Sequence, residues 1–287
     1  MRVALLFQPR IAASVDHAQR TQNRLKCRGL DAWCVSSWEI TERPDDLAGA
    51  ELVVTFGGDG TLLRAARAAA PHRAICLGVN YGRLGFLTEF SPDEFDERLD
   101  DVLDGGYWIE ERVLIDWTHH DANGVVASGL AAGDVVVGRG RMARVVEIEV
   151  RINGVVLTTY TSDGVIVATP TGTTGYVQAA GGPVLHPKVR DLVMTPLVPF
   201  LTPANSIVVG HDERVELTTF TTHEATLSID GQTDQLLTSG DRVVCKASEH
   251  LARFARFRES DYFYATLAEK MRWRVPREMP RPVHGSG

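Results

Sequence analysis

The chain is 287 residues long, with 44% hydrophobic residues, 23% charged residues and a formal net charge of −7. These values are typical of a globular protein with one large domain or two of ordinary size, and they exclude disorder as the default expectation. The acidic balance argues against a general affinity for nucleic acid or for anionic membranes, which basic surfaces bind. Its apolar stretches, such as residues 192–201, fall well short of the roughly 18 apolar residues of a membrane-spanning helix.

The cysteines indicate a reducing compartment. The four of them are scattered, with no C-x-x-C pair and no histidine nearby at zinc-ligand spacing: Cys27, Cys34, Cys76 and Cys245. The apolar start of the chain is too short for a signal peptide, because Gln8-Pro9-Arg10 interrupts it. We therefore expect a cytoplasmic protein with reduced thiols.

The N-terminal third alternates strand-like and helix-like segments, which predicts βαβ units around a parallel sheet. Helices are expected over Val15–Arg28 and over Thr61–Ala70, the latter ending at Pro71. A capping box at Ser91 predicts a further helix that runs to about Leu103. The expected strands are Val3–Phe7, Ala32–Val35, Leu52–Phe56 and Ala74–Val79.

From Tyr107 onwards, short β-branched runs separated by turn residues predict an antiparallel second domain. Asn153-Gly154 is a favoured two-residue hairpin turn, and strands are expected on both sides of it. These strands are Val145–Ile152 and Val155–Tyr160, followed by Val165–Ala168, Ser206–Val209, Val215–Leu217, Ala225–Ile229 and Arg242–Ala247. Near the end, Tyr262–Trp273 has helical spacing, and the last dozen residues have the composition of a frayed tail.

The predicted fold class is an α/β N-terminal domain with a mainly parallel sheet, followed by a β-rich, sandwich-like C-terminal domain. The first domain is expected over residues 1–106 and the second over residues 107–259. Residues 260–287 are expected to form a C-terminal helix and tail.

The run Gly57-Gly58-Asp59-Gly60-Thr61 lies between a predicted buried strand and a helix. Backbone N–H groups and the positive end of the helix dipole make such a position an anion site, and the glycines let a phosphate approach the main chain. Asp59 repels phosphate, so its presence suggests that it holds a metal or accepts a proton from an attacking hydroxyl. The alternative is a solvated aspartate in a glycine-rich turn, but this string arises by chance in on the order of one chain in a thousand. The P-loop and the usual dinucleotide-binding signatures are absent.

Two further runs belong to the same argument. Asn80–Leu87 follows the next strand and is therefore expected at the same sheet edge as Asp59, where open parallel sheets place ligands. Thr169–Tyr176 gathers hydroxyls, glycines and one aromatic ring, which suits hydrogen bonds to ribose or phosphate and stacking on a base. Considered alone, the first could be a turn with a core phenylalanine and the second a surface turn.

In this order along the chain, these motifs resemble the NAD kinase family. The resemblance covers nearly the whole chain and also rests on Leu62-Leu63-Arg64, Asp163-Gly164, Gly181-Gly182-Pro183, Asp230-Gly231-Gln232 and Leu267–Trp273. It implies a homodimer or homotetramer. It also implies phosphoryl transfer from ATP or polyphosphate, with Mg²⁺ or another divalent metal, to the adenosine-ribose 2′-hydroxyl of NAD.

The resemblance implies roles for individual residues. Asp59 would be the catalytic proton acceptor, Phe86 an apolar wall beside the nucleotide, Asp134 the acid that holds ribose hydroxyls, and Tyr176 the stacking ring. The implied phosphate-donor loop is Gly57, Gly58, Gly60 and Thr61. No side chain is assigned to a metal. The implied NAD-binding residues are Asp59, Gly60, Arg64, Phe86, Gly133, Asp134, Arg144, Thr161, Asp163, Thr174, Gly175, Tyr176, Ala179 and Gln232.

Three positions depart from the family's pattern. Gly133 stands where the family usually has Asn, Thr161 where it often has a basic residue, and Gly175 where it usually has Ala. Losing one polar partner typically costs about 1–3 kcal/mol, enough to raise KM by one or two powers of ten. Arg139 and Arg141 could hold phosphates or belong to a solvated basic loop.

Two alternatives stay open from the sequence. Related lipid kinases use the same Gly-Gly-Asp-Gly-Thr string with a different acceptor, and a catalytically weak dinucleotide sensor would keep the binding motifs. The preference between NAD and NADH, the donor, the oligomer size and any feedback ligand are not determined by the sequence.

Overall fold

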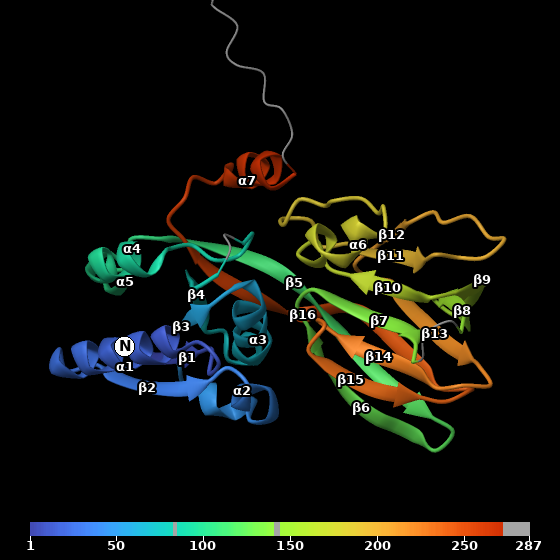
Figure 1. Ribbon diagram of the computed structural model, residues 1–287, viewed down its shortest axis with the longest axis horizontal. Helices are drawn as coiled ribbons and strands as arrows, with labels where there is room; N and C mark the ends of the chain where they lie inside the picture. Colours follow the sequence, from blue (N-terminus) through green and yellow to red (C-terminus); the bar gives the residue numbers. More distant parts are fainter. Residues whose placement is uncertain (83–84, 141–143, 272–287) are drawn as a thin grey trace, which may run out of the picture.

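The computed structural model describes residues 1–82, 85–140 and 144–271 (Figure 1). Its N-terminal unit, coloured blue to teal, is built on four parallel strands in the order β2-β1-β3-β4. These strands are β1 (Arg2–Phe7), β2 (Asp31–Ser36), β3 (Leu52–Gly57) and β4 (Ile75–Asn80). The expected parallel α/β domain is confirmed.

Helices cover both faces of this parallel sheet, and each face has its own apolar core. On one side lie α2 (Glu39–Glu42), the 3₁₀ turn Pro44–Leu47 and α3 (Asp59–Ala69), which continues into the 3₁₀ turn Ala70–His72. On the other side lie α1 (Ala12–Cys27), α4 (Pro92–Glu97) and α5 (Leu99–Leu103). The covered faces explain why the strands read as near-continuous apolar runs.

The C-terminal unit is a β-sandwich. One layer extends the first sheet with β5 (Trp108–Asp121), β6 (Gly124–Ala131), β8 (Val146–Ile152), β9 (Val155–Ser162), β13 (Arg214–Phe220) and β16 (Arg242–Arg256). The other layer is an antiparallel sheet of β7 (Asp134–Arg139), β10 (Gly164–Ala168), β11 (Leu192–Leu197), β12 (Ile207–Val209), β14 (Ala225–Ile229) and β15 (Thr233–Leu237). Side chains of both layers form one core, so the predicted sandwich is confirmed.

Strand β16 belongs to both units. Most of it pairs antiparallel with β5, and its first five residues also pair with β13, but near its end Arg253 and Phe254 pair in parallel with Ile75 and Cys76 of β4. The result is one ten-stranded sheet that runs from β2 to β9. The domain bounds after residues 106 and 259 stay predictions.

Several local predictions are confirmed and others are wrong. The hairpin turn at Asn153-Gly154 and the capping box at Ser91 are present. The helix expected from the capping box is instead two short helices that meet at Arg98. The last strand continues past Ala247 to Arg256. Strands β5, β6, β7, β11 and β15 were not expected.

The remaining elements lie around the sandwich edge: the 3₁₀ turn Gly172–Thr174, α6 (Tyr176–Ala179) and α7 (Tyr262–Lys270), shown in red in Figure 1. The helix predicted to reach Trp273 ends at Lys270, and the predicted tail lies outside the described residues. No helix in the described parts of the chain is long and apolar enough to cross a membrane.

Candidate functional site

The carboxylate of Asp59 is held by three backbone N–H groups. β3 ends directly before it and α3 begins at it, so Asp59 lies at the carboxyl edge of the parallel sheet. The N–H of Phe86 donates to Oδ2 at 2.8 Å, and those of Leu87 and Thr88 donate to Oδ1, each at 3.2 Å. Both oxygens therefore have fixed positions relative to the loop that follows β4.

Gly85 makes this arrangement possible. A Cβ atom at position 85 would lie 1.9 Å from Oδ1 of Asp59, so only glycine allows the loop to approach the carboxylate this closely. The sequence motif at 80–87 thus acts on Asp59 through its backbone. Residues 83 and 84 of that motif lie outside the described residues.

A hollow of about 380 Å³ lies beside the first turn of α3, and we call it the donor hollow. The first N–H groups of a helix have no partner within the helix and attract anions. Arg64, one turn further along, has no hydrogen bond or ion pair among the described residues, and burial and Arg67 lower its pKa. The hollow is lined by Gln8, Ile11, Gly58, Gly60, Thr61, Arg64, Asp230, Gly231 and Gln232.

A turn from the sandwich closes over α3. The side chain of Gln232 donates to the carbonyl of Gly60 at 2.9 Å and accepts from Arg67 at 3.1 Å. The buried carboxylate of Asp230 lies 3.4 Å from the Arg67 guanidinium. These contacts join the C-terminal unit to the helix that carries Asp59.

Asp230 also organises the start of β7. Its carboxylate accepts the N–H groups of Ala132, Gly133 and Asp134 at 3.1, 2.7 and 3.0 Å. A Cβ at Gly133 would lie 3.2 Å from Asp230 and 3.9 Å from Leu63 of α3, so this stretch packs closely against the helix. Gly133 and Asp134 therefore lie at the interface, on the side of the sandwich that faces α3.

Asp134 is the most perturbed carboxyl of this region. Burial, and secondarily the charge of Asp230, raise its pKa to about 7. Among the described residues, no side chain or backbone group donates a hydrogen bond to its carboxylate. A group of this kind is well matched to hydroxyl donors from a ligand, which stabilise the ionised form.

The threonine-rich turn lies directly over Gly133. The hydroxyl of Thr169 donates to the carbonyl of Ala132 at 2.7 Å, and its N–H donates to the carbonyl of Gly133 at 2.9 Å. A Cβ at Gly172 would lie 2.2 Å from that same carbonyl, so the turn requires glycine there. In the later part of this run, Thr174 is partly buried, whereas Gly175 and Tyr176 are exposed, Tyr176 by 49%, as is Ala179 just after it.

Three residues of the expected NAD-binding set lie away from the domain interface: Thr161, Asp163 and Arg144. In the register of β7 and β10, Asp134 is opposite Ala168 and Gly138 is opposite Gly164. Asp163 and Thr161 therefore lie at the other end of these strands, roughly 13 Å or more from Asp134 at 3.3 Å per residue. Phe86, Gly60, Arg64, Gly133, Asp134 and Gln232, by contrast, gather around the domain interface.

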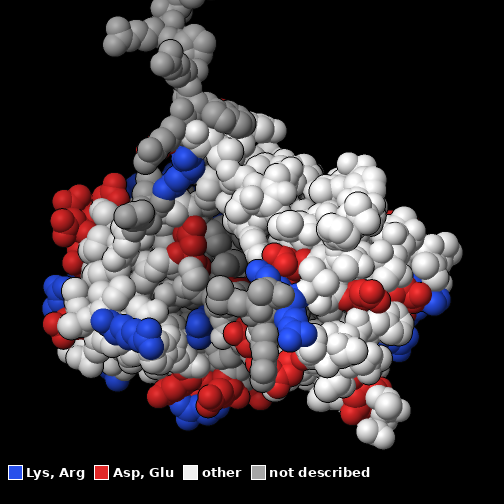
Figure 2. All heavy atoms as spheres, turned by 45° about the vertical axis from the view of Figure 1, so that its right-hand side comes forward, with Lys and Arg blue, Asp and Glu red and all other residues white. Residues whose placement is uncertain are grey.

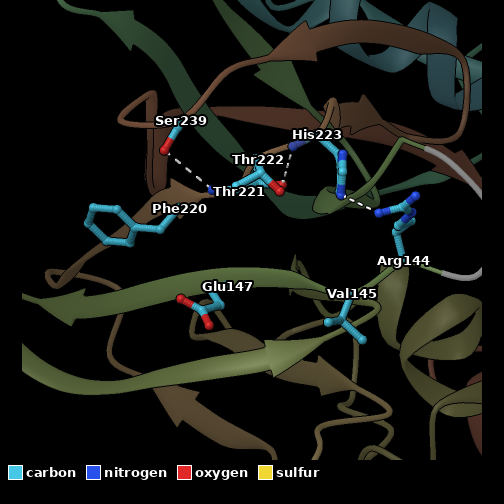
Figure 3. Close-up of a pocket in the computed structure, with 8 residues that line it drawn as sticks. All are labelled: Arg144, Val145, Glu147, Phe220, Thr221, Thr222, His223 and Ser239. Atoms are coloured by element: carbon cyan, nitrogen blue, oxygen red, sulfur yellow. Dashed lines mark hydrogen bonds between the residues drawn. The ribbon is translucent and has the colours of Figure 1, made fainter.

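Arg144 lines a separate surface hollow, in which its guanidinium lies 2.6 Å from the ring of His223 (Figure 3). The figure also shows the hydroxyl of Thr221, which accepts from the N–H of His223 at 3.0 Å, and that of Ser239, which accepts from the N–H of Thr221 at 3.3 Å. Arg139, considered for phosphate binding, lies 3.3 Å from the carboxylate of Asp163 instead. Arg141 lies outside the described residues.

Residues 85–88, whose last three N–H groups hold the Asp59 carboxylate, are called the Asp59 loop, and behind it lies a set of buried charges that the sequence motifs did not indicate. Arg256, 1% exposed, donates through Nη1 to the carbonyl of Leu87 at 2.6 Å and through Nε to Glu110 at 2.8 Å. The sequence reasoning also missed Asp230 and Arg67 as the residues that join the two units. The Asp-Gly dipeptide at 230 was visible, but its partners are about 100 residues or more away, and no local pattern indicates them.

The glycine-rich loop, the fixed carboxylate and the donor hollow at the junction of two domains define a phosphotransferase. Residues 7–107 match the family model of the ATP-NAD kinase N-terminal domain, and residues 132–257 match that of the ATP-NAD kinase C-terminal domain. The chain belongs to the NAD kinase family.

Individual relatives agree with this assignment. An NAD kinase from Dehalococcoides mccartyi is 39% identical over 94% of this chain and 96% of its own, and one from Chloroflexus aurantiacus is 36% identical over 94% and 98%. A crystal structure of an NAD kinase from Archaeoglobus fulgidus in complex with ATP has a TM-score of 0.74 at 26% identity, covering 95% of this chain and 99% of its own. Yeast NADH kinase complexed with NADH shares the fold, with a TM-score of 0.82 at 20% identity over 98% and 90%.

Proposed function

We propose that the protein transfers the terminal phosphoryl group of ATP to the 2′-hydroxyl of the adenosine ribose of NAD. The relatives named NAD kinase support the acceptor, and the Archaeoglobus fulgidus structure, which is in complex with ATP, supports the donor. The observation that carries the proposal is the fixed Asp59 carboxylate beside the donor hollow.

In this proposal, Asp59 orients the 2′-hydroxyl and takes its proton as the oxygen attacks the donor's terminal phosphorus. A carboxylate offers about four acceptor positions, of which backbone N–H groups use three. No other described residue bonds to this carboxylate, so the remaining position, on Oδ2, can accept a hydroxyl. The new P–O bond forms as the bond to the leaving diphosphate breaks, and ADP departs with that electron pair.

The phosphates of the donor would lie in the donor hollow, against the backbone of Gly57, Gly58, Gly60 and Thr61. Backbone dipoles fixed in this way neutralise charge that develops on the transferred group. Mg²⁺ would enter as part of the MgATP substrate, because this ion prefers phosphate oxygens and water. Polyphosphate is a second possible donor for the same hollow.

On the acceptor side, Asp134 would bind ribose hydroxyls and Phe86 would form an apolar wall beside Asp59. The Thr169–Tyr176 turn supports an adenosine site because it lies against Gly133, next to Asp134. For Arg144, Thr161 and Asp163, which lie at the far end of the sandwich, a contact with the same dinucleotide has no support in the geometry of one chain.

We further propose that the protein is a homodimer or homotetramer. β9 lies at the end of the ten-stranded sheet and exposes Val155, Val156 and Leu157, by 71, 49 and 44%. Edge strands with apolar side chains favour pairing with another chain. A large part of the face in Figure 2, at the upper right, also carries no charged side chains. Sedimentation analysis of Val156→Lys tests this, and an unchanged oligomer would refute a β9 interface.

The test of the activity is an assay for NADP that crosses NAD and NADH with ATP and polyphosphate. We expect Asp59→Asn to keep the fold and to lose at least 10²–10⁴-fold in kcat, the usual contribution of general-base catalysis. Asp212→Asn, at an exposed position of the sandwich, is the matched control. Near-normal turnover in the Asp59 variant would refute the mechanism. Formation of a phosphorylated product from diacylglycerol would indicate a lipid kinase instead of an NAD kinase. Tight NAD binding without NADP formation would indicate a dinucleotide sensor.

A further inference from the structure

Four charged side chains are buried together beneath the Asp59 loop, and we call them the buried charge cluster: Glu89, Glu110, Arg112 and Arg256. Their exposed fractions are 6, 3, 4 and 1%. Well-packed apolar side chains often stabilise a fold as well as a buried ion pair does, whereas breaking such a pair costs about 3–5 kcal/mol. Stability alone therefore gives no reason for charges at this place.

One end of the cluster holds the loop that holds Asp59. Arg256 donates to the carbonyl of Leu87, and the N–H of Leu87 donates to Oδ1 of Asp59. Glu89 anchors the next part of the loop, because it accepts the N–H groups of Phe257 and Arg258 at 2.8 and 2.9 Å. A displacement of Arg256 would therefore move an N–H donor of the Asp59 carboxylate.

The other end of the cluster reaches the threonine-rich turn. Arg112 donates to the hydroxyl of Thr171 at 3.2 Å and to Glu110 at 3.1 Å. Thr171 directly precedes Gly172, which packs against the carbonyl of Gly133. Glu110 accepts from both Arg112 and Arg256, so a single carboxylate joins the two ends.

The C-terminal helix completes the cluster. The hydroxyl of Tyr262, the first residue of α7, lies 2.8 Å from Nη2 of Arg112 and 3.1 Å from Glu110. Tyr262 thus connects α7 to the cluster, and its ring also lies 5.3 Å from the Arg256 guanidinium. Thus β5, β16, the loop after β4, the threonine-rich turn and α7 all meet at one set of charges.

We propose that the buried charge cluster positions the Asp59 carboxylate relative to the turn that would hold the adenosine, with Arg256 and Tyr262 as positioning residues. This inference rests on the proposed function, because the distance that the cluster would set is the one between the carboxylate of Asp59, as the base, and the 2′-hydroxyl of the ribose. A misplacement of about 1 Å in such a pair costs on the order of 10²-fold in rate. Neither residue needs to touch substrate.

The experiment compares Arg256→Lys with Arg242→Lys. Both arginines lie on β16 and pair with a buried glutamate, but Arg242 contacts Glu216 within the sandwich. We expect Arg256→Lys to lower kcat by 10- to 100-fold with little change in KM for NAD. Arg242→Lys should leave kcat within twofold. Equal losses in both variants would overturn the inference.

A double variant tests whether Arg256 acts through Asp59. Once Asp59→Asn has removed the base, adding Arg256→Lys should cost less than twofold further in kcat. Effects that multiply in the double variant would overturn the inference. Tyr262→Phe and Thr171→Val keep the shape of each side chain and cover the case in which Arg256→Lys does not fold. Each should lower kcat at least threefold in a protein that still folds, with a lowered Tm because buried partners lose a hydrogen bond; unchanged kcat in both refutes the proposal.

Hydrogen exchange gives a readout that does not depend on the reaction. In Arg256→Lys, amides of residues 85–90 should exchange at least tenfold faster than in the wild type, while those of β11 keep their rates. Unchanged exchange in this loop would overturn the inference even if the wild type formed no NADP. An inactive wild type with the expected exchange pattern would instead refute the proposed function alone.

Discussion

Replacing Asp134 by asparagine should stabilise the protein at neutral and alkaline pH. Burial and Asp230 raise the pKa of Asp134 to about 7, from an ordinary value of 3.8. The folded state therefore binds this proton more tightly than the unfolded state does. Between about pH 4 and pH 7 the free energy of unfolding falls as pH rises, and above that range the full cost of the buried charge is present. A shift of three units corresponds to roughly 4 kcal/mol, an upper value for a group that solvent partly screens.

The assay is urea denaturation, followed by circular dichroism, of wild type and Asp134→Asn at pH 4, 6 and 8. Asparagine resembles the protonated acid at every pH, so the two proteins should differ by less than about 1 kcal/mol at pH 4. At pH 8 the variant should be about 1–4 kcal/mol more stable. A difference that does not grow with pH would refute the reasoning, and so would an asparagine variant that is less stable at pH 8. Asp212→Asn, which lies exposed on the sandwich, is the control and should show no such trend.

Three smaller predictions concern the Asp59 carboxylate and two contacts at the domain interface. Gly85→Ala should lower kcat at least tenfold and also destabilise the protein by about 1–3 kcal/mol, because the new Cβ would lie 1.9 Å from Oδ1 of Asp59 and displace the carboxylate; steady-state kinetics with normal rates would contradict this contact. Gln232→Ala should lower the free energy of unfolding, measured by urea denaturation, by about 1–2 kcal/mol, since it removes the hydrogen bonds to Gly60 and Arg67. A decrease below about 0.3 kcal/mol would show that these two hydrogen bonds contribute little. Gly133→Ala should cost about 1 kcal/mol, measured in the same way, because its Cβ would press on Asp230 at 3.2 Å; a stabilised variant would be the opposite result.

Local patterns in the sequence predicted much of the N-terminal fold, since its strands are buried on both faces and its helices carry recognisable start and stop signals. The strands of the sandwich were harder to predict from the sequence. β5 and β6 contain histidines, aspartate and glycines, and their apolar residues do not alternate over most of their length. β16 crosses a bulge between Ala247 and Leu251, where the alternation breaks and the expected strand ended.

For the candidate site, the sequence indicated residues through short motifs, and the structure adds what joins them. Asp59 is recognisable from its glycines, but its three N–H donors lie 27 to 29 residues further along the chain. Arg256 and Glu110 are 146 residues apart, and neither belongs to a motif. Such partners depend on strand pairing across the whole chain, which periodicity and turn chemistry do not encode.

The strand shared by both units also limits how this protein can be made. The guanidinium of Arg253 donates to the carbonyl of Arg73, a contact between residues 180 apart in the sequence, and Arg253 and Phe254 are the parallel partners of Ile75 and Cys76 in β4. During synthesis, the nascent N-terminal unit therefore leaves the ribosome with the edge of β4 unpaired until residues 253 and 254 have been translated. At about 5–20 residues per second, this edge stays open for roughly 10 to 40 s, during which pairing with other chains competes with folding.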